Sequence, residues 1–108
     1  MLNDRLVFRK WGWYFTLIDG EHFKVKLLWF NMRDGLSYQR HELRKELWLF
    51  LKGWGSFNQE KRELSRVFKG EWRFVEVNEF HQYFPFEPTL VLEIQFGEKC
   101  DEEDIVRG

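Results

Sequence analysis

The stretch LSYQRHELRKELWLFLKG, residues 36–53, decides the fold. It places Gln39, His41, Glu46 and Gly53 at the spacing Q-x-H-x4-E-x6-G. Residues two apart on a strand point to the same face, so Gln39 and His41 would share a face. A short reversal of the chain after His41 would return Glu46 to that face on the next strand. The spacing therefore predicts an inward-facing polar cluster between neighbouring strands.

A lone histidine, His81 in the phrase NEFHQYF, follows this stretch. Together, Gln39, His41, Glu46 and His81 offer two imidazoles, a carboxylate and an amide oxygen. That set suits a divalent ion of borderline hardness, namely zinc, iron(II), manganese or nickel. We therefore predict that these four residues form a metal site in the mouth of a small β-barrel.

Each predicted ligand has an alternative role. His41 could be a solvent-facing strand residue, and His81, which lies among aromatic residues, could be a hydrogen-bonded core histidine. A register slip of one residue would turn Glu46 to the opposite face. Gln39 is the weakest ligand, because a neutral amide binds metal less strongly than imidazole or carboxylate. It could instead orient a water molecule or a substrate hydroxyl.

Short segments rich in β-branched and aromatic residues recur along the whole chain, with turn signals between them. The segments are WYFTLID, FKVKLLWFN, LSYQRHE, ELWLFLKGWGSF, LSRVF, WRFVEVN and TLVLEIQF. A spacing of roughly 8–12 residues favours a sandwich or barrel. The segment HELRKELWLFL also fits an amphipathic helix, by its charges at i and i+4, but the Gly-rich stretch after it favours strands. We predict an all-β fold.

The composition fits one small domain. The chain has 108 residues, of which 21 are Phe, Trp or Tyr, so it can bury one substantial core. Its net charge of -1 gives no reason to expect binding to a nucleic acid polymer or a membrane. The single cysteine, Cys100, fits a reducing compartment, and no signal peptide or run of about 20 apolar residues is present. We expect a soluble, cytoplasmic protein.

The spacing around His41 resembles the first cupin motif, H-x-H-x4-E-x6-G, with Gln39 in place of its first histidine. His81 resembles the lone histidine of the second cupin motif. More specifically, the chain resembles the C-terminal cupin domain of the type II mannose-6-phosphate isomerase/mannose-1-phosphate guanylyltransferase family. Four phrases carry the resemblance: RKWGWY (9–14), GEHFKVKLL (20–28), LSYQRHELRKELW (36–48) and EEDIVR (102–107). It implies a single cupin domain over residues 1–108, a double-stranded β-helix or jelly-roll barrel.

The chain departs from the family pattern at several positions. Leu43 and Leu47 stand where the family has histidines, and Lys10 replaces the proline of the opening phrase. Glu76 and Asn78 replace a P-x-G turn, although Asn tolerates the left-handed conformation such a turn needs. We expect the four metal ligands to be kept while the polar shell around them is thinned.

The resemblance implies metal-dependent aldose–ketose isomerisation of a sugar phosphate, specifically mannose 6-phosphate. The metal would polarise the sugar oxygens and stabilise an enediolate, and Arg44 and Lys26 would act at the reacting substrate. A general base is harder to identify, since the extra histidines are absent. Lys26 and Glu76 are candidates without a motif to support them.

A phosphorylated ligand needs cationic groups, which Arg supplies as a bidentate donor and Lys as a point charge. The residues expected to bind it are Lys24, Lys26, Arg44, Trp48 and Arg107. Trp48 would offer an aromatic wall to a sugar or base, with a buried core ring as the alternative. Ordinary solvated strand charges are the alternative for the cations.

Two other functions stay open. The chain could be a non-catalytic cupin that binds or sequesters a phosphorylated sugar or a nucleotide-like molecule, standing alone without a nucleotidyltransferase domain. It could also be a structural or oligomerisation domain with an empty barrel. A phosphorylated small molecule is the expected partner, and pairing of edge strands makes a homodimer a further possibility.

Overall fold

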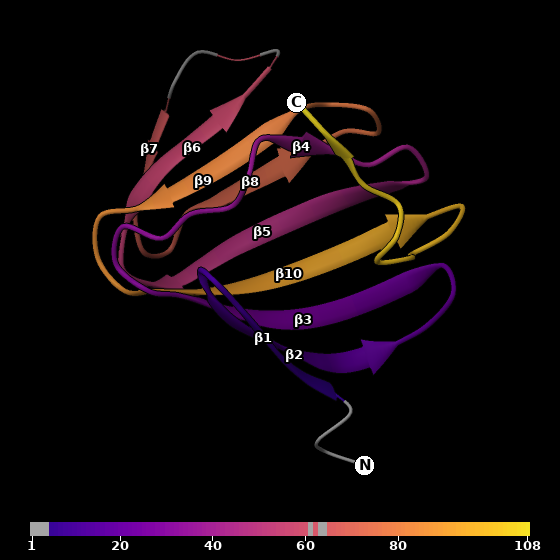
Figure 1. The fold of residues 1–108 in the computed structure, drawn as a ribbon, viewed down its shortest axis with the longest axis horizontal. Coiled ribbons are helices and arrows are strands. Elements are labelled where there is room, and N and C mark those ends of the chain that lie inside the picture. Colours follow the sequence, from indigo (N-terminus) through magenta and orange to yellow (C-terminus); the bar gives the residue numbers. More distant parts are fainter. Residues whose placement is uncertain (1–4, 61, 63–64) are drawn as a thin grey trace.

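A computed structural model describes residues 5–60, 62 and 65–108, and from residue 6 onward every secondary-structure element in the described part is a β-strand (Figure 1). The strands are β1 Leu6–Arg9, β2 Gly12–Asp19, β3 Phe23–Phe30, β4 Gln39–Arg40, β5 Arg44–Lys52, β6 Gly55–Gln59, β7 Ser65–Val67, β8 Trp72–Val75, β9 His81–Pro85, β10 Thr89–Gly97 and β11 Val106–Arg107. The prediction of an all-β fold is confirmed. The helical alternative for HELRKELWLFL is wrong, because β5 buries alternate residues as a strand does.

The strands form two antiparallel sheets that face each other. One sheet has the order β1-β2-β3-β10-β5-β8 and the other the order β11-β4-β9-β6-β7. Neighbours in each sheet are mostly distant in sequence, as in β3 with β10 and β4 with β11. Figure 1 shows the two sheets as the walls of a barrel, and the C-terminal strand β11 pairs with β4 at the edge of the five-stranded sheet.

The inward-facing residues change character along the central strands. On β5 they run from Arg44 and Glu46 to Trp48 and Phe50, all of which are buried. The inward-facing residues of β3 change in the same direction along the chain, from lysine to leucine and phenylalanine. In β10, which is antiparallel to both strands, they change in the opposite direction, from valine to glutamate and glutamine. The strand register aligns these changes across the sheet. The barrel therefore has a polar end and an apolar end.

The apolar end is an aromatic core that joins the two sheets. Phe30 of β3 lies edge-on to Tyr83 of β9, with ring centroids 5.1 Å apart, and Trp48 lies edge-on to Phe57 of β6 at the same separation. These rings are almost wholly buried. Aromatic pairs of this geometry add to the stabilisation from apolar burial. The core fixes the spacing of the two sheets and leaves the polar end as the open mouth.

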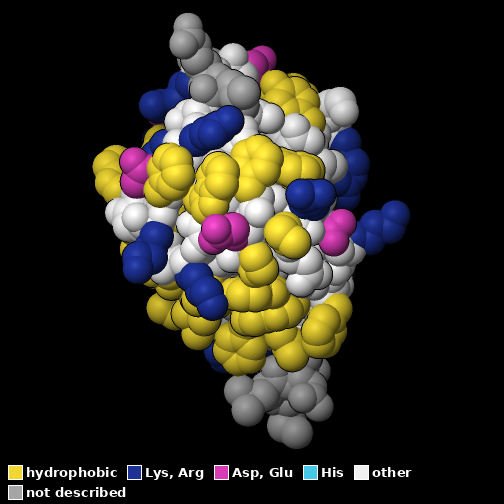
Figure 2. Space-filling view, turned by 90° about the vertical axis from the view of Figure 1, so that its left-hand side faces the viewer, with side chains coloured by type: hydrophobic (Ala, Val, Ile, Leu, Met, Phe, Trp, Pro, Cys, Tyr) yellow, Lys and Arg dark blue, Asp and Glu magenta, His cyan; other side chains and the backbone are white. Residues whose placement is uncertain are grey.

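Hydrophobic side chains also gather on the outside of the molecule (Figure 2). Trp54, beside the start of β6, stacks on Phe68 at 5.5 Å and contacts Phe86 at 4.9 Å, while Phe84 lies edge-on to Phe86. Phe68, Phe84 and Phe86 are exposed. The surface aromatic residues therefore continue the apolar end outward, away from the polar mouth.

Two turns explain residues singled out in the sequence. Gly53 has φ of 81°, and a Cβ atom there would lie 2.3 Å from the carbonyl oxygen of Pro88. Only glycine fits such a position, which accounts for the glycine of the motif. Asn78 has φ of 62° and its N–H donates to the carbonyl of His41 at 2.7 Å. The left-handed bend expected at Asn78 is confirmed.

Within the described residues, the structure contains no helix with the length and apolar character needed to cross a membrane.

Candidate metal and ligand site

Three of the predicted metal ligands meet at the polar end of the barrel. His41 Nε2 lies 3.2 Å from Glu46 Oε2, and His81 Nε2 lies 3.4 Å from Glu46 Oε1. One ligand atom from each residue falls within 4.8 Å of the others, and all three residues are buried. Gln39 pairs in register with His81 across β4 and β9 and is buried as well. The predicted clustering of the four residues is therefore observed.

The hydrogen bonds of the two imidazoles indicate which ring nitrogen is available. His41 Nδ1 lies 2.7 Å from the carbonyl oxygen of Asp104, and His81 Nδ1 lies 3.2 Å from that of Glu79. A carbonyl only accepts, so Nδ1 carries the proton in both rings and Nε2 keeps its lone pair when the ring is neutral. Histidine ligands of metals are commonly oriented by this kind of second contact.

Two lone pairs and a carboxylate that converge in a buried space repel each other unless a cation lies among them. Among the described residues, His81 Nε2 is a buried atom without a hydrogen-bond partner. Buried polar atoms of this kind are rare in folded proteins and call for an explanation such as an ion. Imidazole and carboxylate are also the donors that zinc and related divalent ions take. The residues therefore fit a divalent metal ion.

The charge states of the cluster suit the same purpose. Burial lowers the pKa of His41, although Glu46 beside it opposes the change, so the ring is neutral near pH 7. Burial alone would raise the pKa of Glu46, but the Arg44 guanidinium beside it helps to hold that pKa well below its usual value. A neutral imidazole beside an ionised carboxylate is the protonation state in which both bind metal.

Arg44 supplies the cation that the cluster has in this structure. Its Nε and Nη2 atoms each lie 3.0 Å from Glu46 Oε2, and Nη2 lies 3.4 Å from His41 Nε2. The other carboxylate oxygen, Oε1, accepts a hydrogen bond of 3.0 Å from Trp48 Nε1. Arg44 thus occupies lone pairs on two of the three ligands and neutralises Glu46.

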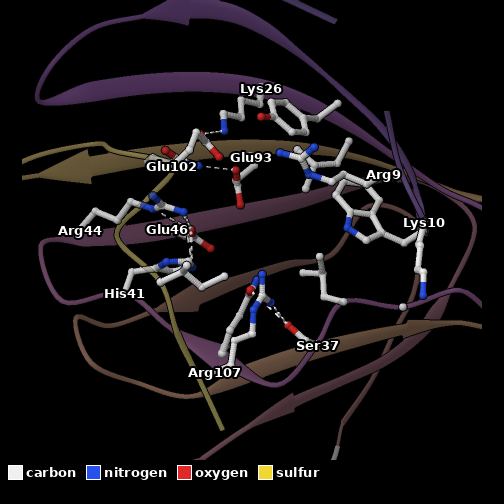
Figure 3. Close-up of a pocket in the computed structure, with 18 residues that line it drawn as sticks. Arg9, Lys10, Lys26, Ser37, His41, Arg44, Glu46, Glu93, Glu102 and Arg107 are labelled. Carbon is white, nitrogen blue, oxygen red and sulfur yellow. Dashed lines mark hydrogen bonds and ion pairs between the residues drawn. The ribbon is translucent and has the colours of Figure 1, made fainter. Parts of the chain in front are cut away.

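A cavity of about 560 Å³ opens in front of the cluster (Figure 3). This volume lies in the range of ordinary small-molecule sites. His41, Arg44 and Glu46 lie together on one side of it, while Arg107 and Ser37 lie on another. Charged and polar side chains line the cavity around the cluster, and Trp11, Leu28, Leu36 and Ile105 add apolar surface to it.

A second buried carboxyl, Glu93 of β10, lines the same cavity and was missed from the sequence. Burial, with a smaller effect from Glu46, raises the pKa of Glu93 to about 8. Gln95 Nε2 donates to its Oε1 at 2.8 Å. A signal was present, since Glu93 and Gln95 interrupt the apolar inward positions of TLVLEIQF at a spacing of two.

The structure corrects three roles that the sequence predicts. Lys24, near the start of β3, does not line this cavity, and its Nζ lies 3.4 Å from Asp19 Oδ1. Trp48 is not an aromatic wall, because its ring is 1% exposed and packs in the core. Glu76 is not a candidate base, because it is exposed and lies 3.9 Å from Lys45.

Three predicted cations do line the cavity. Arg44 pairs with Glu46, and Lys26 pairs with Glu102 and lies 4.2 Å from the centre of the Tyr14 ring. Arg107 Nη1 donates to Ser37 Oγ at 2.6 Å. Two of the three cations therefore already have carboxylate partners.

The expected thinning of the polar shell is wrong at position 47. Leu47 faces the outer surface of the six-stranded sheet, opposite to Glu46, and pairs in register with Phe74 and Ile94. Leu43 is half-buried just before β5 and does not line the cavity. Neither substitution removes a polar group from the cavity wall.

Comparisons with known proteins agree with this architecture. The family described as mannose-6-phosphate isomerase C-terminal matches residues 1–108. Mannose-1-phosphate guanylyltransferase 2 of Escherichia coli O157:H7 is 29% identical over 98% of this chain and 22% of its own length. A mannose-1-phosphate guanylyltransferase of Salmonella montevideo is 30% identical over 98% of this chain and 23% of its own length. The chain thus spans less than a quarter of the length of these curated relatives.

A solved structure extends the agreement in fold. An uncharacterised conserved protein with a double-stranded β-helix domain, from Klebsiella pneumoniae, superposes with a TM-score of 0.76 over 98% of this chain and 86% of its own. The two sequences are 9% identical, so the likeness concerns the fold alone. The predicted double-stranded β-helix is confirmed.

Proposed function

The chain belongs to the family of mannose-6-phosphate isomerase C-terminal domains, and from that premise we propose that it catalyses metal-dependent aldose–ketose isomerisation of a sugar phosphate of the mannose 6-phosphate type. One observation carries the proposal. The two imidazole lone pairs converge with the Glu46 carboxylate beside a cavity that also contains a second, protonatable carboxyl, Glu93. Isomerisation needs both an electrophile and a group that moves a proton.

A divalent ion held by His41, Glu46 and His81, with Gln39 beside them, would supply Lewis acidity to the sugar carbonyl. The other requirement is a base that takes a proton from C2 of the open-chain sugar and returns it to C1. Glu93 is our candidate, because a carboxyl whose pKa is raised to about 8 titrates near physiological pH. The hydrogen bond from Gln95 would hold the Glu93 carboxyl in place.

The choice of Glu93 as the base is also supported by the other carboxylates of the cavity, because each of them already has an ion-pair partner. Arg44 neutralises Glu46 and Lys26 neutralises Glu102, which leaves Glu93 as the carboxyl without an ion-pair partner among the described cavity residues. The leucines at 43 and 47 do not weaken the proposal, since neither position lines the cavity. The names of the relatives include guanylyltransferase, but this chain matches too little of their length for that activity to be proposed.

The test is turnover of mannose 6-phosphate to fructose 6-phosphate by protein loaded with zinc or manganese. We expect His41→Ala to lose both metal and activity. Glu93→Gln should keep the metal and lose activity by roughly 10²–10⁴-fold, the usual contribution of general acid–base catalysis. Glu76→Gln, which removes an exposed carboxylate, is the matched control and should leave turnover unchanged. Turnover by Glu93→Gln at the wild-type rate would rule out Glu93 as the base.

A non-catalytic binding role is the second candidate, and the position of Arg44 favours it. Its guanidinium already contacts Glu46 and His41, so the cluster can exist with an internal cation in place of a metal. In that case the protein would bind mannose 6-phosphate in the presence of a chelator and show no turnover with any divalent ion.

A further inference from the structure

We infer that Arg9 and Arg107 form a subsite for the phosphate group of the ligand at the outer end of the cavity, with Lys10 on its rim. The inference rests on the proposed sugar-phosphate function and names the side chains that would read the phosphate. Of the cations that the sequence predicts for a phosphorylated ligand, it keeps Arg107 and leaves out Lys24, Lys26 and Arg44.

The balance of charge in the cavity leads to this assignment. Five cationic side chains and three carboxyl groups line it. Lys26 pairs with Glu102, and Arg44 pairs with Glu46. Burial raises the pKa of the third carboxyl, Glu93, to about 8, so that it is largely protonated near pH 7. Among residues 5–60, 62 and 65–108, no carboxylate lies within ion-pair distance of the other three cations, Arg9, Lys10 and Arg107. The outer cavity is therefore positive in a chain whose net charge is -1.

The positions of these cations suit recognition of an anion from two sides. Arg9 ends β1 at the edge of the six-stranded sheet, and Arg107 lies on β11 at the edge of the five-stranded sheet. Figure 3 shows their side chains reaching the cavity from its opposite sides, with Lys10 farther out. These residues are distant in sequence, and they share a cavity because the two sheets face each other.

Each arginine is also held in place by a neutral neighbour. Arg107 Nη1 donates to Ser37 Oγ at 2.6 Å, and the Arg9 guanidinium lies 5.6 Å from the centre of the Tyr14 ring. Neither contact neutralises the charge, and each guanidinium keeps further N–H donors. A phosphate monoester carries close to two negative charges at neutral pH and takes bidentate hydrogen bonds from Arg. To do the same, Arg44 would have to give up the buried Glu46 carboxylate, and Lys26 would have to give up its ion pair with Glu102.

The subsite also gives the ligand a direction. The metal cluster and Glu93 are buried, whereas Arg9 and Arg107 are exposed, so the carbonyl end of an open-chain sugar would point inward and the phosphate end outward. A cavity of about 560 Å³ is large enough for a ligand placed in this way. Sugars without phosphate would lose the outer contacts and keep the inner ones.

The experiment is calorimetric titration of mannose 6-phosphate and of mannose into wild type and into Arg9→Gln, Arg107→Gln and the double variant. Both arginines are exposed, so the variants should fold, and thermal melting checks this. A charge-assisted hydrogen bond contributes about 1.5–3 kcal/mol, which is roughly tenfold or more in affinity. We expect each single variant to weaken mannose 6-phosphate at least tenfold and the double variant at least thirtyfold, with mannose unaffected.

The matched control is the double variant Arg66→Gln/Lys69→Gln, which removes the same charge from exposed positions outside the cavity and should bind as wild type does. Wild-type affinity for mannose 6-phosphate in the Arg9→Gln/Arg107→Gln protein would overturn the subsite while leaving the proposed function intact. Equal weakening by the control variant would also overturn it, because the effect would then come from net charge. Absence of any mannose 6-phosphate binding by wild type would overturn the subsite and the proposed function together.

Discussion

Replacement of Glu93 by glutamine should make the protein more stable, and increasingly so as the pH rises. The carboxyl is 5% exposed, and its pKa is about 8 in the folded protein against an ordinary value of 4.5. Between those two values the folded chain holds a proton that the unfolded chain has released. The free energy of unfolding therefore falls by about 1.4 kcal/mol per pH unit in this window. The contribution of the Glu93 carboxyl to the free energy of unfolding is fully present below pH 4.5 and is lost as the pH rises through 8.

Glutamine has nearly the same shape and still accepts the hydrogen bond from Gln95, but it has no proton to lose. At pH 7 the difference between Glu93→Gln and wild type should be about 3 kcal/mol, and at pH 5 it should be below about 1 kcal/mol. Titrating groups that do not interact with Glu93 contribute equally to both proteins and cancel in the comparison.

The assay is urea unfolding followed by tryptophan fluorescence at pH 5, 6, 7 and 8, with a chelator present so that metal binding does not contribute. Glu76→Gln serves as the control for loss of an exposed carboxylate, and its curve should run parallel to that of wild type. If the curves of wild type and Glu93→Gln were parallel across this range, Glu93 would not hold a proton in the folded state. Its role as the proton-moving group would then lose its basis.

Three further perturbations follow from the site and the turns. Arg44→Met leaves the buried Glu46 carboxylate without its guanidinium, so the metal-free protein should lose about 3–5 kcal/mol of stability, and saturating zinc should raise its melting temperature by more than it raises that of wild type. Trp48→Phe removes the 3.0 Å hydrogen bond to Glu46 and should cost about 1–3 kcal/mol in urea unfolding. Gly53→Ala places a Cβ atom 2.3 Å from a carbonyl oxygen and should lower the free energy of unfolding by more than about 3 kcal/mol. Gly70→Ala, at φ of 91° in open space, should cost only about 1–2 kcal/mol, because only the left-handed backbone opposes it. Equal losses at the two glycines would contradict the steric argument.

The parts of the fold that follow from local rules were predictable from the sequence. Alternation of period two identified the strands, and the spacing of Gln39, His41 and Glu46 placed them on one face, because both depend only on neighbouring residues. The outward direction of Leu47 followed from the same alternation, since Glu46 beside it faces inward. The prediction of a thinned polar shell was therefore avoidable.

The missed features depend on contacts between distant segments. The raised pKa of Glu93 comes mainly from its burial on β10, which lies between β3 and β5 in the assembled six-stranded sheet. The convergence of Arg9 with Arg107 likewise requires two sheets to meet. Lys24 lies two residues before Lys26 on β3, but its partner, Asp19, is set by the pairing of β2 with β3. A strand pattern read from one sequence carries no information on which strands become neighbours.

The composition of the barrel interior argues against a purely structural role for the polar end. The core already joins the sheets through Phe30, Phe50 and Tyr83, and the same strands could have continued with apolar residues. Replacing buried ion pairs by well-packed apolar side chains is often neutral or stabilising. Glu46 and Glu93 instead place two carboxyl groups close enough for Glu46 to raise the pKa of Glu93, an arrangement that lowers the stability of the folded chain above pH 4.5. Such a cost fits a site that binds an ion and moves a proton better than it fits a scaffold.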